Sequence, residues 1–106
     1  MSTVLITGAS RGIGRAAAKL FAEAGWDLLL VSKDKFALET LRKELENTNQ
    51  KIFYVSVDFS KPEKISPAID DLLSNGLIPS VLINNAGVAW TGDLLNMPIN
   101  SWQWIL

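Results

Sequence analysis

The chain has 106 residues, a formal net charge of -1, 48% hydrophobic residues and 20% charged residues. This length suits one domain with one core, and the composition is typical of a soluble globular protein rather than of a basic partner of nucleic acid. Cysteine and histidine are both absent, which excludes disulfides, thiolate and imidazole metal sites, cysteine nucleophiles and histidine-based catalytic triads.

Apolar runs alternate with amphipathic helical patterns along the chain. The predicted strands are continuous apolar runs or are rich in β-branched and aromatic residues, whereas apolar residues recur every three or four positions in the predicted helices. The strands are expected at Thr3–Thr7, Leu28–Val31, Ile52–Val57 and Val81–Ile83. The helices are expected from Ile13 to Gly25, through Leu38, Leu41 and Leu45, from an N-cap at Ser60 through Leu73 to Gly76, and from about Pro98 onward.

This alternation of strands and helices predicts an α/β fold. Near-continuous apolar strands indicate a parallel sheet that is covered on both faces. Right-handed crossovers between these strands give the strand order 3-2-1-4, which is one half of a doubly wound parallel sheet. No linker divides the chain, so we expect a single domain over residues 1–106 that is a truncated, N-terminal part of such a fold.

A glycine-rich loop follows the first strand and opens the first helix, with the spacing Gly8-x-x-x-Gly12-x-Gly14. Glycines allow backbone to approach a diphosphate closely, and the N–H groups and dipole of the helix start then face the anion. The alternative is a tight turn without a ligand. The candidate diphosphate-binding residues are Gly8, Ser10, Arg11, Gly12, Ile13 and Gly14.

The second strand leads into Ser32-Lys33-Asp34, where an acidic residue would bind the ribose 2′-hydroxyl of NAD. Ser32 can instead donate to a 2′-phosphate, and Lys33 together with Arg11 can neutralise it, which favours NADP. Two alternatives remain open. The cluster is a solvated polar helix start, or Asp34 faces the ribose and NAD is bound.

Polar residues also follow the third and fourth strands. Asp58 can accept a hydrogen bond from an adenine amino group while the backbone of Phe59 frames the ring, although Asp58 or Ser60 can equally cap the next helix. The fourth strand ends in the run Asn84-Asn85-Ala86-Gly87. This run lies where open α/β sheets bind ligands, and its small residues let a flat cofactor pass close to the backbone. An asparagine amide there can tie neighbouring strand ends together, for example to Thr7.

The glycine loop, Asp58 and the run Asn84 to Gly87 follow one another in a characteristic order and spacing. In this pattern the chain resembles, over its whole length, the classical short-chain dehydrogenase/reductase family. The resemblance implies a Rossmann fold and NAD(P)-dependent hydride transfer to or from a carbonyl or alcohol. It implies that the glycine loop binds the diphosphate, that Arg11 and Lys33 match basic residues of NADP-preferring members, and that Asp58 lies at the adenine. The backbone of Asn85, Ala86 and Gly87 is then expected beside the adenosine ribose, where it also stabilises the central sheet.

The catalytic residues that the resemblance implies are missing. The family uses an Asn, a Ser and a Tyr-x-x-x-Lys helix in which the lysine lowers the pKa of the tyrosine. The only tyrosine of this chain is Tyr54, with Asp58 four positions later. No residue is therefore carried over as catalytic, and Tyr54 is expected in the core or on a sheet face.

We therefore interpret the chain as the cofactor-binding half of an NADP-dependent oxidoreductase, with NAD possible, that is inactive alone. Its partners would be a nicotinamide dinucleotide and, only at full length, a small carbonyl or alcohol substrate and further copies of itself. The sequence has no secretory signal and no apolar run of ~20 residues, so we expect a cytoplasmic protein without a membrane partner. The apolar end Ser101–Leu106 has no helix-stop signal and suggests a chain cut short. The alternatives are a non-catalytic dinucleotide-binding module and an inert fragment.

Overall fold

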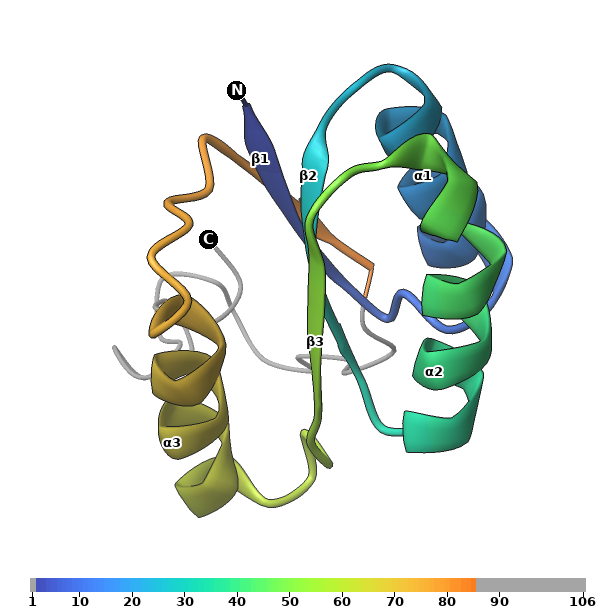
Figure 1. Ribbon diagram of the computed structural model, residues 1–106. Helices are drawn as coiled ribbons and strands as arrows, with labels where there is room; N and C mark the ends of the chain where they lie inside the picture. Colours follow the sequence, from blue (N-terminus) through green and yellow to red (C-terminus); the bar gives the residue numbers. More distant parts are fainter. Residues whose placement is uncertain (1, 86–106) are drawn as a thin grey trace.

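The computed structural model describes residues 2–85, which form one parallel four-stranded sheet with helices on both faces (Figure 1). The strand order β3-β2-β1-β4 is the order that the sequence predicts. The predicted fourth helix and the chain end lie outside the described residues. In chain order the elements are β1 (Thr3–Thr7), α1 (Gly12–Glu23), β2 (Asp27–Ser32), α2 (Lys35–Glu44), the short 3₁₀ helix η1 (Glu46–Thr48), β3 (Ile52–Ser56), α3 (Pro62–Leu73) and β4 (Val81–Asn84).

The central strands β1 and β2 are buried along their whole length. On one face of the sheet α1 and α2 cover side chains such as Ile6 and Leu28, and on the other face α3 covers Leu29 and Val31 (Figure 1). Burial on both faces explains why these strands are continuous apolar runs without polar alternation. None of the helices within residues 2–85 is long and apolar enough to cross a bilayer.

At their carboxyl ends, β2 and β4 each run one polar residue beyond the predicted apolar run, to Ser32 and to Asn84. Ser32 at the end of β2 pairs with Ser56, and Thr7 at the end of β1 pairs with Asn84. Conversely, β3 ends one residue before Val57, although the Val57 N–H still donates to the Ser32 carbonyl at 2.9 Å. The strands therefore end together at one edge, where loops from β1, β2 and β3 meet.

The predicted cap of the third helix is wrong. This helix begins at Pro62 and its N-cap residue is Lys61, without a side-chain cap. The Ser60 hydroxyl donates instead to Asp58 Oδ1, and the Lys61 N–H donates to the Asp58 carbonyl in a tight turn. Proline fixes φ near the helical value and lacks the N–H that a first-turn residue leaves unpaired, so it suits this start without a cap.

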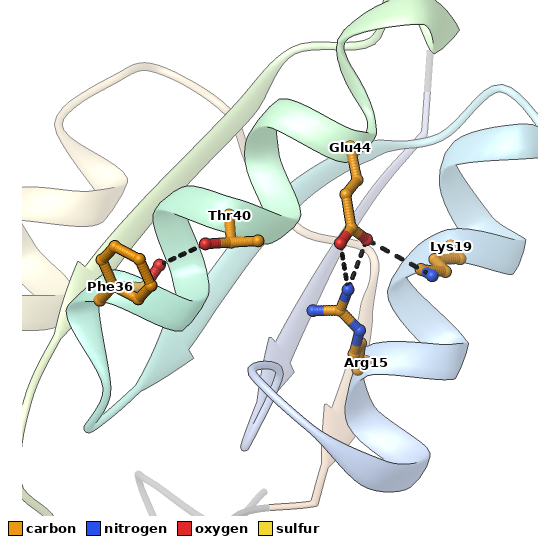
Figure 2. Close-up of polar contacts among 5 residues, drawn as sticks. All are labelled: Arg15, Lys19, Phe36, Thr40 and Glu44. Carbon is orange, nitrogen blue, oxygen red and sulfur yellow. Dashed lines mark hydrogen bonds and ion pairs between the residues drawn. The ribbon is translucent and has the colours of Figure 1, made fainter.

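Helices α1 and α2 are joined on their outer side by an ion-pair cluster of Arg15, Lys19 and Glu44 (Figure 2). Arg15 donates to both carboxylate oxygens of Glu44, and the Lys19 Nζ lies 3.4 Å from Oε2. Hydrogen bonding from the Arg15 guanidinium lowers the pKa of Glu44 below its usual value, and Lys19 acts in the same direction. In α2 itself, Thr40 donates its hydroxyl to the carbonyl of Phe36 one turn earlier (Figure 2).

Candidate functional site

A groove of about 600 Å³ lies where β1, β2 and β3 end. The carboxyl ends of parallel strands share one edge of a sheet, so the loops that follow them converge there. Most of the residues singled out from the sequence line this groove. Gly14 does not line it, and Ala86 and Gly87 lie outside the described residues. The lining residues are Gly8, Ser10, Arg11, Gly12, Ile13, Ser32, Lys33, Asp58, Phe59, Ser60 and Asn85.

The glycine loop brings the start of α1 against the end of β1. A Cβ atom at Gly14 would lie 2.2 Å from the Gly8 carbonyl oxygen and 2.8 Å from Asn85 Nδ2, so only glycine allows this approach. Gly12 has φ +62°, in the left-handed region that favours glycine. Arg11, the N-cap residue of α1, gives no side-chain cap. The first-turn N–H groups, which lack intrahelical partners, therefore remain available to an anion in the groove.

Thr7 ties the end of β1 to the end of β4. Its hydroxyl donates to Asn84 Oδ1 at 2.9 Å and accepts from the Asn85 N–H at 2.9 Å. The Asn85 side chain also donates to the Gly8 carbonyl at 3.5 Å. The expectation that an asparagine amide links neighbouring strand ends through Thr7 is thus confirmed, and the link fixes Asn85 beside the glycine loop.

At the end of β2 the three polar residues lie in different surroundings. The buried Ser32 hydroxyl lies 2.6 Å from the buried Ser10 hydroxyl, and either can be the donor. The Lys33 side chain is 78% exposed. Asp34 is not among the groove-lining residues, and its carboxylate accepts a hydrogen bond from the Ala37 N–H at 3.0 Å as the N-cap of α2. The sequence predicted that both serines line the cofactor site, but it did not predict that their hydroxyls pair with each other.

After β3, the Asp58 carboxylate has a partner at each oxygen. Oδ1 accepts from the Ser60 N–H at 2.9 Å and from its hydroxyl at 2.7 Å, whereas Oδ2 lies 3.7 Å from the Lys33 Nζ. Hydrogen bonds from the side chain and then the backbone of Ser60 lower the pKa of Asp58, and the Lys33 charge adds to this. Sequence reasoning missed Ser60 as a groove residue because it assigned the hydroxyl to a helix cap.

Residues outside the groove offer little alternative chemistry. Within residues 2–85, no cluster of three or more histidine, cysteine, aspartate or glutamate side chains could hold a metal ion. Tyr54 lies in β3 and packs against the hydrophobic core, as expected for a sheet residue. Desolvation and the nearby Glu39 raise the pKa of its phenol, which is the opposite of what a catalytic base needs near neutral pH.

Comparison with known proteins identifies the family. A family model described as short chain dehydrogenase matches residues 2–106. The chain belongs to this family. It is 37% identical over 97 residues to the mouse dehydrogenase/reductase SDR family member 7B, a match that covers 88% of this chain and 30% of the relative. The chain therefore spans about a third of the length of that curated relative.

Two solved structures have the same fold. An alcohol dehydrogenase from the archaeon Thermococcus sibiricus, complexed with 5-hydroxy-NADP, superposes with a TM-score of 0.78 at 30% identity. That match covers 99% of this chain and 45% of the other. L-Sorbose reductase from Gluconobacter frateurii, complexed with NADPH and L-sorbose, gives a TM-score of 0.74 at 29% identity and covers 97% and 40% of the two chains. The resemblance and the Rossmann-type fold expected from the sequence are confirmed.

Proposed function

We propose that this chain is the cofactor-binding part of an oxidoreductase that uses NADP to reduce a carbonyl or oxidise an alcohol. The observation that carries the proposal is the groove itself. A glycine loop, a helix N-terminus and the cations Arg11 and Lys33 line one groove at the carboxyl edge of a parallel sheet. A dinucleotide has the flat rings and the anionic groups that such a groove can hold.

The groove residues fit a dinucleotide by their chemistry. The close approach at Gly14 holds the start of α1 against the end of β1, and the loop so placed would hold the diphosphate through Gly8, Ser10, Arg11, Gly12 and Ile13. Asp58 and Phe59 would hold the adenine, and Asn85, Ala86 and Gly87 would lie beside the adenosine ribose. When bound, the nicotinamide supplies or accepts the hydride, while the protein binds and orients it.

Three observations support NADP over NAD. Ser32 and Lys33 line the groove at the end of β2, where they can donate to a 2′-phosphate. Asp34, the acidic residue that would favour NAD, caps α2 and is not among the lining residues. In addition, the two solved structures described above were determined with NADPH and with 5-hydroxy-NADP.

The complete activity is proposed to need residues that these 106 do not contain. The chain holds no Tyr-x-x-x-Lys motif, so we expect it to be inactive alone and to work within a longer, cytoplasmic and homo-oligomeric enzyme. The coding sequence after Leu106 tests this directly. An open reading frame that carries Tyr-x-x-x-Lys is expected, and a stop codon directly after Leu106 would contradict the proposal.

Cofactor choice is tested by titrating NADPH and NADH against the tryptophan fluorescence of the chain. We expect tighter binding of NADPH, and we expect Lys33→Asp to weaken NADPH binding by about tenfold or more while NADH changes little, because a charge-assisted phosphate contact is lost. Lys51→Asp is the matched control. Lys51 is exposed and lies just before β3, at the amino ends of the strands and so at the opposite end of the sheet from the groove. Tighter NADH binding by the wild type, or equal effects of the two variants, would contradict the NADP assignment.

A further inference from the structure

The ammonium group of Lys33 already has an anionic neighbour in the groove. Its Nζ lies 3.7 Å from Asp58 Oδ2, although the two residues follow different strands, β2 and β3. The Ser56 hydroxyl donates to the Lys33 carbonyl at 2.7 Å and so holds the backbone of this segment to the end of β3. The lysine that would neutralise a 2′-phosphate thus lies within reach of a carboxylate.

The two members of this pair differ in how firmly they are held. Two hydrogen bonds from Ser60, at 2.9 and 2.7 Å, fix the Asp58 carboxylate, whose side chain is 28% exposed. The Lys33 side chain is 78% exposed, and its flexible stem carries three donors that can turn to a new acceptor. A negative charge is therefore fixed beside a positive charge that can move.

Resting on the proposed function, we propose that Asp58 competes with the ribose 2′-phosphate for Lys33 and thereby limits the preference of this groove for NADP over NAD. A bound phosphate takes the ammonium from the carboxylate. The carboxylate, still fixed by Ser60, then stays in the groove without its Lys33 partner and repels the phosphate. Both effects weaken only ligands that carry the 2′-phosphate.

The proposed adenine contact of Asp58 does not obscure this effect. Adenine is common to both cofactors, so loss of an adenine contact weakens both ligands by the same factor. The ratio of the two affinities cancels that factor and retains the influence of Asp58 on the phosphate. Adenosine 2′,5′-bisphosphate and adenosine 5′-monophosphate differ only by this phosphate and are therefore the appropriate pair of probes.

The test measures the affinities of the full chain for these two nucleotides by isothermal titration calorimetry. Asp58→Asn is expected to raise the ratio of bisphosphate to monophosphate affinity by about two- to fivefold, the range that exposed ion pairs reach. In a Lys33→Met background the same substitution should change the ratio much less, because there is no cation to release. Asp34→Asn is the matched control. It removes a carboxylate next to Lys33 in sequence, keeps a good N-cap, and should leave the ratio unchanged.

Three results would overturn the inference: an unchanged or lower ratio in Asp58→Asn, an equal rise in the Lys33→Met background, or an equal rise in Asp34→Asn. If Asp58→Asn fails to fold by circular dichroism, Ser60→Ala replaces it. Loss of the serine hydroxyl removes one of the two hydrogen bonds that fix the Asp58 carboxylate and leaves the bond from the backbone N–H. The ratio should therefore rise less than in Asp58→Asn, and an unchanged ratio counts against the proposal. A wild type that binds neither nucleotide contradicts the proposed function itself. A wild type that binds both with the wrong response contradicts only the competition.

Discussion

Helix α1 is held to the rest of the protein in two contrasting ways. At its first turn, Gly14 lies so close to the Gly8 carbonyl and to the Asn85 side chain that no Cβ atom fits. Further along its outer side, Arg15 and Lys19 reach across solvent-exposed surface to Glu44 of α2 (Figure 2). The first contact depends on shape, whereas the second depends on charge.

The difference explains where this fold tolerates change. A close backbone contact in a packed region has no room to relax, so any added atom displaces the helix start. Exposed ion pairs can be replaced by water and salt at little cost. The proposed cofactor binding depends on the contact at Gly14, because this contact keeps the N-terminus of α1 facing the groove. The ion-pair cluster only adds to the attachment of α1.

The largest expected effect is that of Gly14→Ala. The added methyl group would lie 2.2 Å from a backbone oxygen, so α1 must shift away from β1 and the first-turn N–H groups leave the groove. We expect a loss of about 3 kcal/mol in the free energy of unfolding, measured with urea, and no measurable binding of NADPH.

Gly12→Ala is the matched control for this prediction. Gly12 has φ +62°, but a Cβ there would contact nothing within 4 Å. Its cost is backbone strain alone, about 1 kcal/mol. If Gly14→Ala destabilises the protein no more than Gly12→Ala, the close approach is not what holds the start of α1.

A smaller effect is expected from Thr7→Val, which keeps the shape of the side chain and removes the hydroxyl. Asn84 Oδ1 and the Asn85 N–H then lose a partner at the end of β1. We expect a loss of about 1–2 kcal/mol in the free energy of unfolding and weaker NADPH binding, because Asn85 is no longer fixed beside the glycine loop.

Thr3→Val provides the comparison at the other end of β1. Thr3 is as buried as Thr7, at 3% exposure each, and its hydroxyl forms no side-chain hydrogen bond in the part of the chain that the structure describes. The expected change is much smaller, with NADPH binding intact. Equal losses in the two variants would mean that burial, and not the link between strand ends, accounts for the effect of Thr7→Val.

Sequence patterns predicted the strand, the glycine loop and the helix that meet at Gly14, because these elements depend on local order. The patterns assigned Gly14 to the diphosphate and did not predict its close contact with the Gly8 carbonyl. The glycine spacing of residues 8–14 follows a buried strand and precedes a helical stripe, and handedness rules then fix the strand order. Even the link from Thr7 to Asn84 was predictable, because parallel strands that are neighbours bring their ends together.

Contacts between residues that are distant in sequence and carry no motif were not predictable. Arg15 and Glu44 are 29 positions apart, and their pairing depends on how α1 and α2 lie across the sheet. Ser60 was read as a helix cap because serine commonly caps helices. Its hydroxyl donates to Asp58 instead. Serine is common both in turns and at helix N-caps, so its propensity alone does not distinguish the turn of residues 58–61 from a cap of α3.

The smallest expected effect is that of Glu44→Gln, and it depends on pH. The Arg15 guanidinium and Lys19 lower the pKa of Glu44 in the folded protein below the ordinary value of 4.5. A carboxyl whose pKa is lowered by folding stabilises the folded state above its unfolded pKa and loses that contribution as the pH falls through the folded pKa. The melting temperature of the wild type should therefore be slightly above that of Glu44→Gln at pH 7. This difference should shrink as the pH falls below about 4.5 and vanish once the pH is below the lowered pKa of Glu44.

Thermal melts of both proteins between pH 3 and pH 7 measure this difference, and added salt should reduce it. Glu46→Gln is the control, because Glu46 is exposed in η1 and forms no ion pair within residues 2–85. NADPH binding should be the same in all three proteins at pH 7, since Glu44 lies away from the groove. A loss of NADPH binding in Glu44→Gln would show that the ion-pair cluster helps to position the glycine loop, and that the two attachments of α1 are not independent.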